Sequence, residues 1–438
     1  MEPVVERIDR RAPGARDFVL RFWDGSEVPP PAGVDAGLTL VVRRPEALSY
    51  TLRQPNELGL GRAWVTGALD VEGDLERGLA LRERFNGLRL SAADRLAAMR
   101  AAVRVGALSL RSPAIPESEA RLAGGRRHSL RRDRAAVRHH YDVSNAFYRL
   151  VLGPTMVYSC AYFGSPDDTL EEAQERKLEL ICRKLRVQPG ERLLDIGCGW
   201  GSLVLHAARE HGVRAVGVTL SQPQAELARE RIRDAGLSDR CEIRVADYRE
   251  VDDRPYDKVA SVGMYEHVGR ARLADDVGRV KRLLRPGGLF LNHGIVRAVP
   301  RPWGRHSFIA RYVFPDGELH PVGTVIATME RAGLEIRDAE SLREHYALTL
   351  RRWVANLAAN RDAAVAEAGD ERERVWRLYM TGSALAFAAG DISVHQVLAA
   401  KAGASHGLPL ARGRCWRAGP ASPAPPTRSP SGHLIDCW

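Results

Sequence analysis

The sequence predicts an α/β protein in which a mostly parallel sheet is joined to a smaller N-terminal α+β domain. From about residue 190, short apolar runs alternate with helical segments, as in a sheet covered by helices on both faces. The first of these runs leads into a glycine-rich turn, LLDIGCGWG at 193–201. A length of 438 residues with 45% hydrophobic content allows two or three domains and excludes a disordered or fibrous class.

The predicted elements of the first domain are short and mixed in type. Strand-like runs at 18–28 and 37–44 alternate with helical patterns at 74–85 and 92–105, which predicts a small α+β domain. Composition then changes to Pro, Gly, Ser and Arg, and near the end of the chain to Pro and Ser. The expected divisions are an N-terminal domain, a basic linker, a catalytic domain and a disordered tail, at 1–110, 111–139, 140–410 and 411–438.

The larger domain shows a regular succession of strands and helices. The predicted strands are 192–196, 214–219, 242–246, 257–262 and 288–293, with a last strand near 392–400. The predicted helices are 201–210, 222–235 and 272–284, followed by helices around 322–332, 347–366 and 371–389.

Charge and targeting signals limit the compartment and the partners. The net charge is +10 with a pI near 9.5, so the surface attracts anions such as nucleic acid or acidic lipids. The N-terminus lacks the apolar core of a signal peptide, and no run approaches the roughly 18 apolar residues of a membrane span. We therefore expect a cytoplasmic protein.

The six cysteines have no CxxC or metal-ligand spacing. They predict reduced thiols, any of which would act singly, and no metal site.

The glycine-rich turn is the first candidate binding site. Gly197, Gly199 and Gly201 follow a G-x-G-x-G spacing, which differs from the G-x-G-x-x-G of dinucleotide-binding folds. No Walker lysine follows, which disfavours phosphate binding, and Asp195 suits a cofactor with a cationic amino acid moiety. A tight structural turn is the alternative interpretation.

This motif resembles that of the S-adenosylmethionine-dependent methyltransferases. The segment RPGG at 285–288 is similar in position to the residues that precede a late strand in these enzymes. The resemblance implies a Rossmann-like methyltransferase fold in which Asp195 and the glycines border the methionine moiety. The second strand lacks the acidic residue that usually binds the ribose. Neutral hydrogen bonds from Thr219, Ser221 and Gln224 are expected there instead.

Polar residues near this turn suggest a second group. Tyr158, Ser159 and Cys160 lie in an aromatic-rich stretch at 140–163, where core packing is the alternative. Glu266 and His293 follow the fourth and fifth predicted strands, at the edge of the sheet where ligands bind. Taken singly, each could equally be structural.

Six motifs together resemble the cyclopropane-fatty-acyl-phospholipid synthases and the related mycolic acid cyclopropane synthases. They are HYDVSN, YSCAYF, LLDIGCGWG, GVTLS, SVGMYEHVG and FPDGEL, in the family's order, and the resemblance runs from about 125 to 410. Residues 1–110 are similar to the accessory domain of the phospholipid-acting branch. The resemblance implies an unsaturated phospholipid substrate in a bilayer, a lipid- or membrane-associated accessory domain and a homodimer.

The family's reaction adds a methyl group from S-adenosylmethionine to a cis double bond and closes a cyclopropane ring with loss of a proton. The intermediate is an acyl-chain cation that aromatic walls protect from water. The candidate walls are Tyr162, Phe163, Tyr265, Phe308, Tyr312 and Phe314.

Residue roles also follow from the resemblance. The implied base is a bound bicarbonate, held by Cys160, Glu266, His293, Ile295 and Tyr346. The implied cofactor contacts are Tyr158, Ser159, Asp195, Gly197, Gly199, Thr219, Gln224 and Tyr248.

A basic segment favours peripheral association with an anionic membrane, although a solvated linker would show the same composition. Its arginines are Arg126, Arg127, Arg131, Arg132, Arg134 and Arg138.

Three other functions remain open. A methylene- or methyl-branched (10-methyl type) acyl product requires the same motifs, whereas a small-molecule methyltransferase or a lipid carrier leaves some of them unexplained. No nucleic-acid-binding module is recognisable in the catalytic domain, so no nucleic-acid partner is expected.

Overall fold

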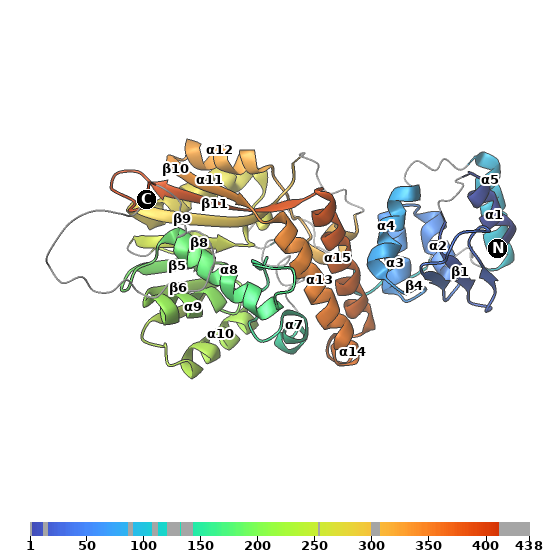
Figure 1. Ribbon diagram of the computed structural model, residues 1–438, viewed down its shortest axis with the longest axis horizontal. Helices are drawn as coiled ribbons and strands as arrows, with labels where there is room; N and C mark the ends of the chain where they lie inside the picture. Colours follow the sequence, from blue (N-terminus) through green and yellow to red (C-terminus); the bar gives the residue numbers. More distant parts are fainter. Residues whose placement is uncertain are drawn as a thin grey trace.

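The computed structural model describes residues 2–11, 16–85, 91–106, 113–120, 132, 143–252, 255–298 and 307–410. They form a sheet domain, a group of long helices beside it and an N-terminal domain that packs on those helices (Figure 1). Most of the predicted basic linker and the whole predicted tail lie outside the described residues. Among the described helices, none is both long and apolar enough to cross a membrane.

The larger sheet has seven strands in the order β10-β11-β9-β8-β5-β6-β7. β11 is antiparallel to both of its neighbours, and the other pairings around β5 are parallel. This confirms the predicted mostly parallel sheet. The strands are β5 Arg192–Ile196, β6 Arg214–Thr219, β7 Cys241–Val245, β8 Tyr256–Val262, β9 Leu284–Val296, β10 Leu334–Ser341 and β11 Ser393–Lys401.

Helices cover both faces of this sheet because side chains on the strands alternate between them. Leu193 packs toward α8 (Leu170–Leu185), α9 (Ser202–His211) and α10 (Gln222–Asp234). Its neighbour Leu194 packs toward the opposite helices, α11 (Leu273–Leu283) and α12 (Val322–Arg331).

Long-range pairing accounts for the differences at β9 and β10, whereas α7 (Asn145–Leu152) and α8 are helices that were not predicted. β9 extends beyond the predicted 288–293 because β11 pairs with it from Leu289 to Val296. The prediction omitted β10, which pairs with the other edge of β11. The helix predicted at 347–366 is two helices that meet at Asn360. The helices beside the sheet are α7 Asn145–Leu152, α13 Arg343–Ala359, α14 Arg361–Ala368 and α15 Asp370–Ala389.

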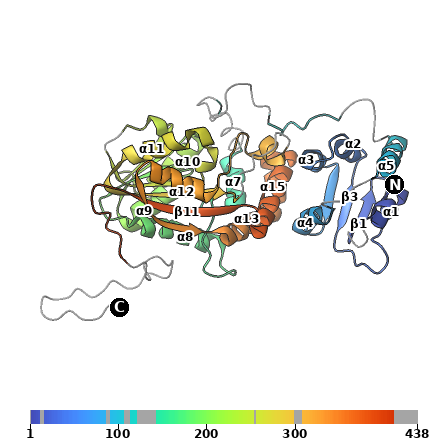
Figure 2. The same ribbon diagram turned by 90° about the horizontal axis from the view of Figure 1, so that it is seen from above.

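The N-terminal domain is an α+β unit with a four-stranded sheet in the order β2-β1-β3-β4. Its strands are β1 Val19–Phe22, β2 Glu27–Val28, β3 Thr39–Val42 and β4 Leu69–Glu72. Its helices are α1 Glu2–Arg11, α2 Glu46–Arg53, α3 Glu57–Val65, α4 Leu75–Phe85 and α5 Ala92–Arg104. Figure 2 shows α3 and α4 facing α15, with the rest of this domain directed away from the larger sheet.

A tryptophan joins the two units. Trp64, 3% exposed at the end of α3, donates its indole N–H to the carbonyl of Arg374 on α15 at 2.9 Å. The guanidinium groups of Arg374 and Arg377 lie 4.4 and 4.9 Å from its ring centroid. Trp64 therefore combines apolar burial, a hydrogen bond and two cation–π contacts.

Trp64→Ala is expected to destabilise the protein by about 3–5 kcal/mol, because it removes a fully packed indole and leaves a cavity at the contact. Trp64→Phe retains an aromatic ring and should cost much less. Thermal unfolding of the two variants and the parent measures the difference. Equal stability of Trp64→Ala and the parent would show that the contact does not hold the units together.

Candidate functional site

The glycine-rich turn after β5 forms the floor of a pocket at the carboxyl edge of the sheet. Gly197 has φ +78°, and a Cβ there would come within 3.0 Å of Met264, so only glycine fits without strain. Gly201, at φ +76°, begins α9. The pocket is lined by all eight residues predicted to contact the cofactor: Tyr158, Ser159, Asp195, Gly197, Gly199, Thr219, Gln224 and Tyr248.

A buried acid and a buried lysine face this pocket. Asp195 is 2% exposed, and its Oδ1 has no hydrogen-bond partner among the described residues. Burial raises the pKa of Asp195 to about 7, although the charge of Lys177 opposes the shift. Lys177, on α8, is also 2% exposed and donates to Ser159 Oγ at 2.9 Å. Burial lowers the pKa of Lys177 to about 8, against the charges of Cys160 and Asp195.

The polar residues that follow β6 and β7 at the pocket differ in part from the prediction. Thr219 Oγ1 donates to Gln224 Oε1 at 2.9 Å, so neutral groups do stand at the end of β6. However, an acid lines the pocket from the next strand along the chain. Asp247 follows β7, and its buried carboxylate accepts hydrogen bonds from Arg249 at 2.7 and 2.8 Å. Asp247 was not predicted, because polar groups for the ribose were expected only at the end of the second strand, whereas Asp247 follows the third.

Aromatic rings pack around Tyr158 at the side of the pocket nearest α13 and α15. Its ring centroid lies 5.2 Å from that of Trp353, 5.6 Å from Trp376 and 5.7 Å from Tyr148. The hydroxyl of Tyr158 lies 3.5 Å from that of Tyr379. These partners come from three helices, α7, α13 and α15, and none of them was predicted from the sequence.

The residues predicted to hold an anion meet beside this aromatic group. Cys160 Sγ contacts the carbonyl of Leu342 at 3.6 Å, and the N–H of Tyr346 donates to the same carbonyl at 3.1 Å. Leu342 N–H in turn donates to Val394 on β11, which lies opposite Ile295 on β9.

The same chain of contacts reaches the remaining two residues. Ile295 N–H donates to Glu266 Oε1 at 2.6 Å, and His293 precedes Ile295 by two positions on the same face of β9. These contacts therefore connect Cys160, Glu266, His293, Ile295 and Tyr346 through Leu342 and Val394, although the five residues are spread over 187 positions.

Two polar atoms in this cluster are buried and have no partner among the described residues: Glu266 Oε2 and His293 Nε2. Burial raises the pKa of Glu266 to about 7. Burial also lowers the pKa of His293 well below its usual value, and the charges of Lys177 and Lys184 add to the effect. His293 is therefore neutral at physiological pH.

Gln396 on β11 orients His293. Its side-chain nitrogen lies 3.2 Å from His293 Nδ1, and donation to that atom leaves the imidazole proton on Nε2. Nε2 is the unpartnered atom, so His293 presents an N–H donor in a buried position. The sequence pattern of β11 showed only a strand and did not reveal this contact.

His293 lies inside β9 and not after it, because pairing with β11 extends the strand past the predicted end. The Ile295 N–H is bonded to Glu266, so an anion would share this donor or displace the carboxylate. Burial raises the pKa of the Cys160 thiol far above its usual range, which keeps the thiol protonated as a hydrogen-bond donor.

The predicted aromatic walls lie at three places. Tyr265 is beside Glu266, and the Phe314 ring lies 5.7 Å from that of Tyr379. Phe308 and Tyr312 stack on each other, with the Tyr312 hydroxyl bonded to Glu119 and Phe308 close to Gly61 of the N-terminal domain. Tyr162 stacks on His345, and the Phe163 N–H donates to His345.

Comparison with known proteins agrees with this geometry. The family model described as mycolic acid cyclopropane synthetase matches residues 128–397, which is more than half of the chain. The chain belongs to this family. It is an S-adenosylmethionine-dependent methyltransferase, and the family resemblance seen in the sequence is confirmed.

Two relatives match almost the whole chain. A probable fatty acid methyltransferase of Mycobacterium tuberculosis is 43% identical over 89% of this chain and 92% of its own length. A probable fatty acid methyltransferase of Pseudomonas putida is 41% identical over 91% of this chain and 96% of its own length.

A solved structure matches the larger domain. The crystal structure of mycolic acid cyclopropane synthase CmaA1 complexed with SAH and CTAB has 36% sequence identity to this chain and a TM-score of 0.58. The alignment covers 98% of that synthase but 61% of this chain. The part of this chain outside that alignment is long enough to contain the N-terminal domain. The alignments with the two fatty acid methyltransferases are long enough to include most of this domain.

The pocket fits S-adenosylmethionine. The cationic amino acid end of this cofactor needs a hydrogen-bond acceptor, and Asp195 Oδ1, which has no partner among the described residues, can supply one. The neighbouring glycines leave room for the cofactor to approach the backbone closely. Tyr248 also lines the pocket, and its aromatic ring can border the adenine. Lys177, Trp200 and Asp247 line the same pocket but were not predicted.

Proposed function

We propose that this methyltransferase modifies the cis double bond of unsaturated acyl chains in membrane phospholipids and forms cyclopropane fatty acids. The observation that carries the proposal is the pair of unpartnered buried atoms, Glu266 Oε2 and His293 Nε2, beside the cofactor pocket. A methyltransferase whose acceptor is already nucleophilic has little need of such a site. An alkene acceptor requires a base to remove a proton after methyl transfer.

The cofactor pocket and the buried cluster divide the work. S-adenosylmethionine, when bound, supplies an electrophilic methyl group. Asp195, Gly197 and Gly199 would hold its amino acid end, and Tyr158 lines the same pocket. Trp353, Trp376 and Tyr379 form apolar walls around Tyr158 that exclude water. Such walls also stabilise a positive charge on the acyl chain by roughly 0.5–2 kcal/mol per ring.

The buried cluster fits bicarbonate, which would supply the base when bound. His293 presents a neutral N–H donor. The thiol of Cys160 is protonated but lies 3.2 and 3.6 Å from the carbonyls of Ala161 and Leu342, so it would have to turn from them to donate to an anion. By the family resemblance, the hydroxyl of Tyr346 would be a further donor. Glu266 would accept the proton of the anion through Oε2 and is held in place through Oε1 by Ile295. Lys177 adds a positive charge near Cys160 and His293, which favours an anion between them.

Association with an anionic membrane is part of the proposal. The relatives named fatty acid methyltransferases extend over the N-terminal domain, and the chain has a strongly positive net charge. Of the six arginines in the predicted basic segment, the structure describes Arg132, which is bonded to Asp316 at 3.0 Å. The others are the candidates for lipid contact.

The second candidate product is a methylene- or methyl-branched acyl chain. The two relatives that match almost the whole chain are named probable fatty acid methyltransferases, and this name is compatible with a methyl-branched product. The same residues would form the same cation, and the fate of the proton would differ.

The test is mass spectrometry, with localisation of double bonds, of lipids from vesicles of unsaturated phosphatidylglycerol incubated with the protein and labelled S-adenosylmethionine. A product that gains CH₂ and loses its double bond supports the ring. A retained double bond, or a saturated methyl branch when a reductant is added, supports the second candidate. Label in free small molecules, or none in lipid, would overturn both.

The reaction is expected to have a bell-shaped dependence on pH. Glu266 must be ionised to accept a proton, so kcat/KM should rise with pH as this group deprotonates near its pKa of about 7. Lys177 must be protonated, so kcat/KM should fall as pH passes its pKa of about 8. Initial rates across this range measure the profile. Both groups should change their ionisation between about pH 6 and 9, so a flat profile over this range would contradict both roles.

A further inference from the structure

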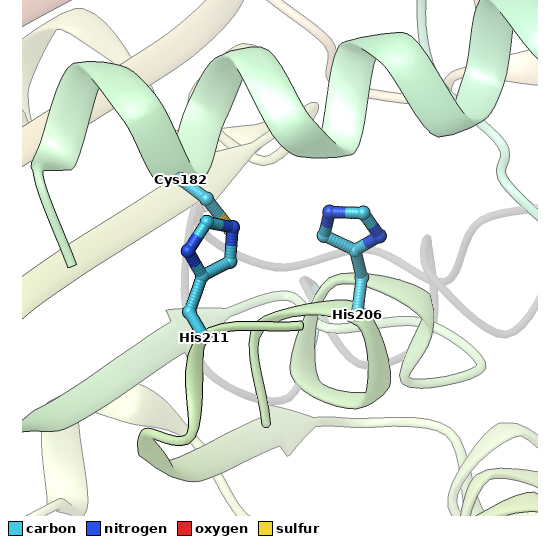
Figure 3. A group of neighbouring side chains, drawn as sticks. All are labelled: Cys182, His206 and His211. Carbon is cyan, nitrogen blue, oxygen red and sulfur yellow. The ribbon is translucent and has the colours of Figure 1, made fainter. Parts of the chain in front are cut away.

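A second group of ligand-type side chains lies between α8 and α9. Cys182 comes from α8, and His206 and His211 come from α9. One donor atom from each lies within 4.8 Å of the others. Figure 3 shows Cys182 directed from α8 toward α9, with both imidazole rings directed from α9 toward it. None of these residues has a role in the proposed reaction.

A carboxylate completes the group. Glu179 lies one turn before Cys182 on α8, and its Oε2 is 3.2 Å from His206 Nε2 and 2.9 Å from His211 Nε2. Arg183 donates to the other carboxylate oxygen at 2.5 Å. Burial would raise the pKa of Glu179, but the hydrogen bonds from His206, His211 and Arg183 outweigh it and keep the carboxylate ionised.

We propose that Cys182, His206 and His211 form a zinc site with Glu179 as the fourth ligand. Thiolate sulfur, imidazole nitrogen and carboxylate oxygen are the donors that tetrahedral zinc uses in proteins. Bond lengths of about 2.0–2.3 Å require donor atoms about 3.3–3.7 Å apart, so atoms of Cys182, His206 and His211 that now lie up to 4.8 Å apart need to close by about 1–1.5 Å. Glu179 Oε2, now 3.2 and 2.9 Å from the two Nε2 atoms, would move slightly away from them. Binding would release the thiol proton, and each neutral ring would bind through its unprotonated nitrogen, with its proton on the other ring nitrogen.

The position of the group favours a structural role. Cys182 is 1% exposed, whereas the side chains of Glu179 and His211 are 25% and 22% exposed, so an ion can enter from solvent. The same two helices contribute Lys177, Ile181 and Ser202 to the wall of the cofactor pocket. Zinc would therefore join the helices behind the pocket without touching the reacting groups.

The experiment is zinc titration of the full chain, stripped of metal, in competition with a chromophoric chelator. We expect submicromolar binding and a higher unfolding temperature with zinc. Cobalt(II) in place of zinc should give a sulfur-to-metal absorption band that Cys182→Ser removes. His211→Ala should weaken zinc binding by at least about 10–100-fold, the loss that even an outer-shell change causes.

The matched controls are Cys241→Ser, which removes another buried free thiol, and His406→Ala. They are needed because Cys415, Cys437 and His433 lie outside the described residues and are themselves metal-binding types. Binding of S-adenosylmethionine by the metal-free variants checks that they fold. Absence of submicromolar zinc binding in the parent, or equal binding by His211→Ala, Cys182→Ser and the controls, would overturn the site.

Discussion

Glu266→Gln is expected to lower the rate of lipid product formation by about 10²–10⁴-fold, the usual effect of losing a positioned acid or base. A carboxamide cannot take up a proton, but its oxygen can still accept the hydrogen bond from Ile295 N–H. The fold and the cofactor pocket should therefore be preserved. Initial rates on unsaturated phospholipid vesicles and calorimetric titration with S-adenosylmethionine measure the two properties separately.

The matched control for this variant is Glu335→Gln, which changes an exposed carboxylate on β10. Cys160→Ser should show the same separation between lost turnover and retained cofactor binding, because it alters another member of the cluster. Parent-like turnover by either site variant would show that the anion site is misassigned. Loss of cofactor binding together with turnover would instead place the residue in the cofactor pocket.

Lys177→Met is expected to reduce turnover by about 10²–10³-fold and to weaken cofactor binding as well. Methionine has nearly the same length but removes the charge that opposes the raised pKa of Asp195. Asp195 would then be mostly protonated at neutral pH and would lose its attraction for a cationic amino acid moiety. Steady-state kinetics in both substrates and cofactor titration above and below pH 7 measure these effects.

Lys177→Arg separates the role of charge from that of shape. The guanidinium group remains protonated throughout the usable pH range, because the pKa of Arg lies well above that of Lys. The alkaline limb of the pH profile should therefore move upward by more than about one pH unit. Lys281→Met is the control, because Lys281 Nζ contacts the carbonyl of Ala332 away from the pocket. An unchanged alkaline limb in Lys177→Arg would show that another group is responsible for it.

The local features of the fold could be predicted closely. The bounds predicted for β5 and β6 coincide with the observed ones, because each is a short, mostly apolar run between turn residues. The eight predicted cofactor contacts line one pocket, since most follow the ends of neighbouring strands or the turn after β5. These signals are contained in a few consecutive residues.

Features that depend on distant pairing could not be predicted. The segment of α8 has the pattern of an amphipathic helix with ordinary solvated charges, yet Lys177 and Lys184 are 2% and 1% exposed. Gln396 meets His293 only through the antiparallel pairing of β9 and β11. Neither contact leaves a mark in local composition, because burial is a property of the assembled core.

The amino-acid sequence alone thus determined the parallel sheet, the cofactor loop and the family, because glycine spacing and the succession of apolar runs can be recognised within a few positions. Only the folded chain decided which charges are buried and which donors meet. Cys182, His206 and His211 have no recognisable spacing in sequence but lie within 4.8 Å of one another in space. The physical reason is that burial shifts the pKa values of side chains and that contacts between helices bring metal-ligand residues together. Neither effect is contained in a short segment of the sequence.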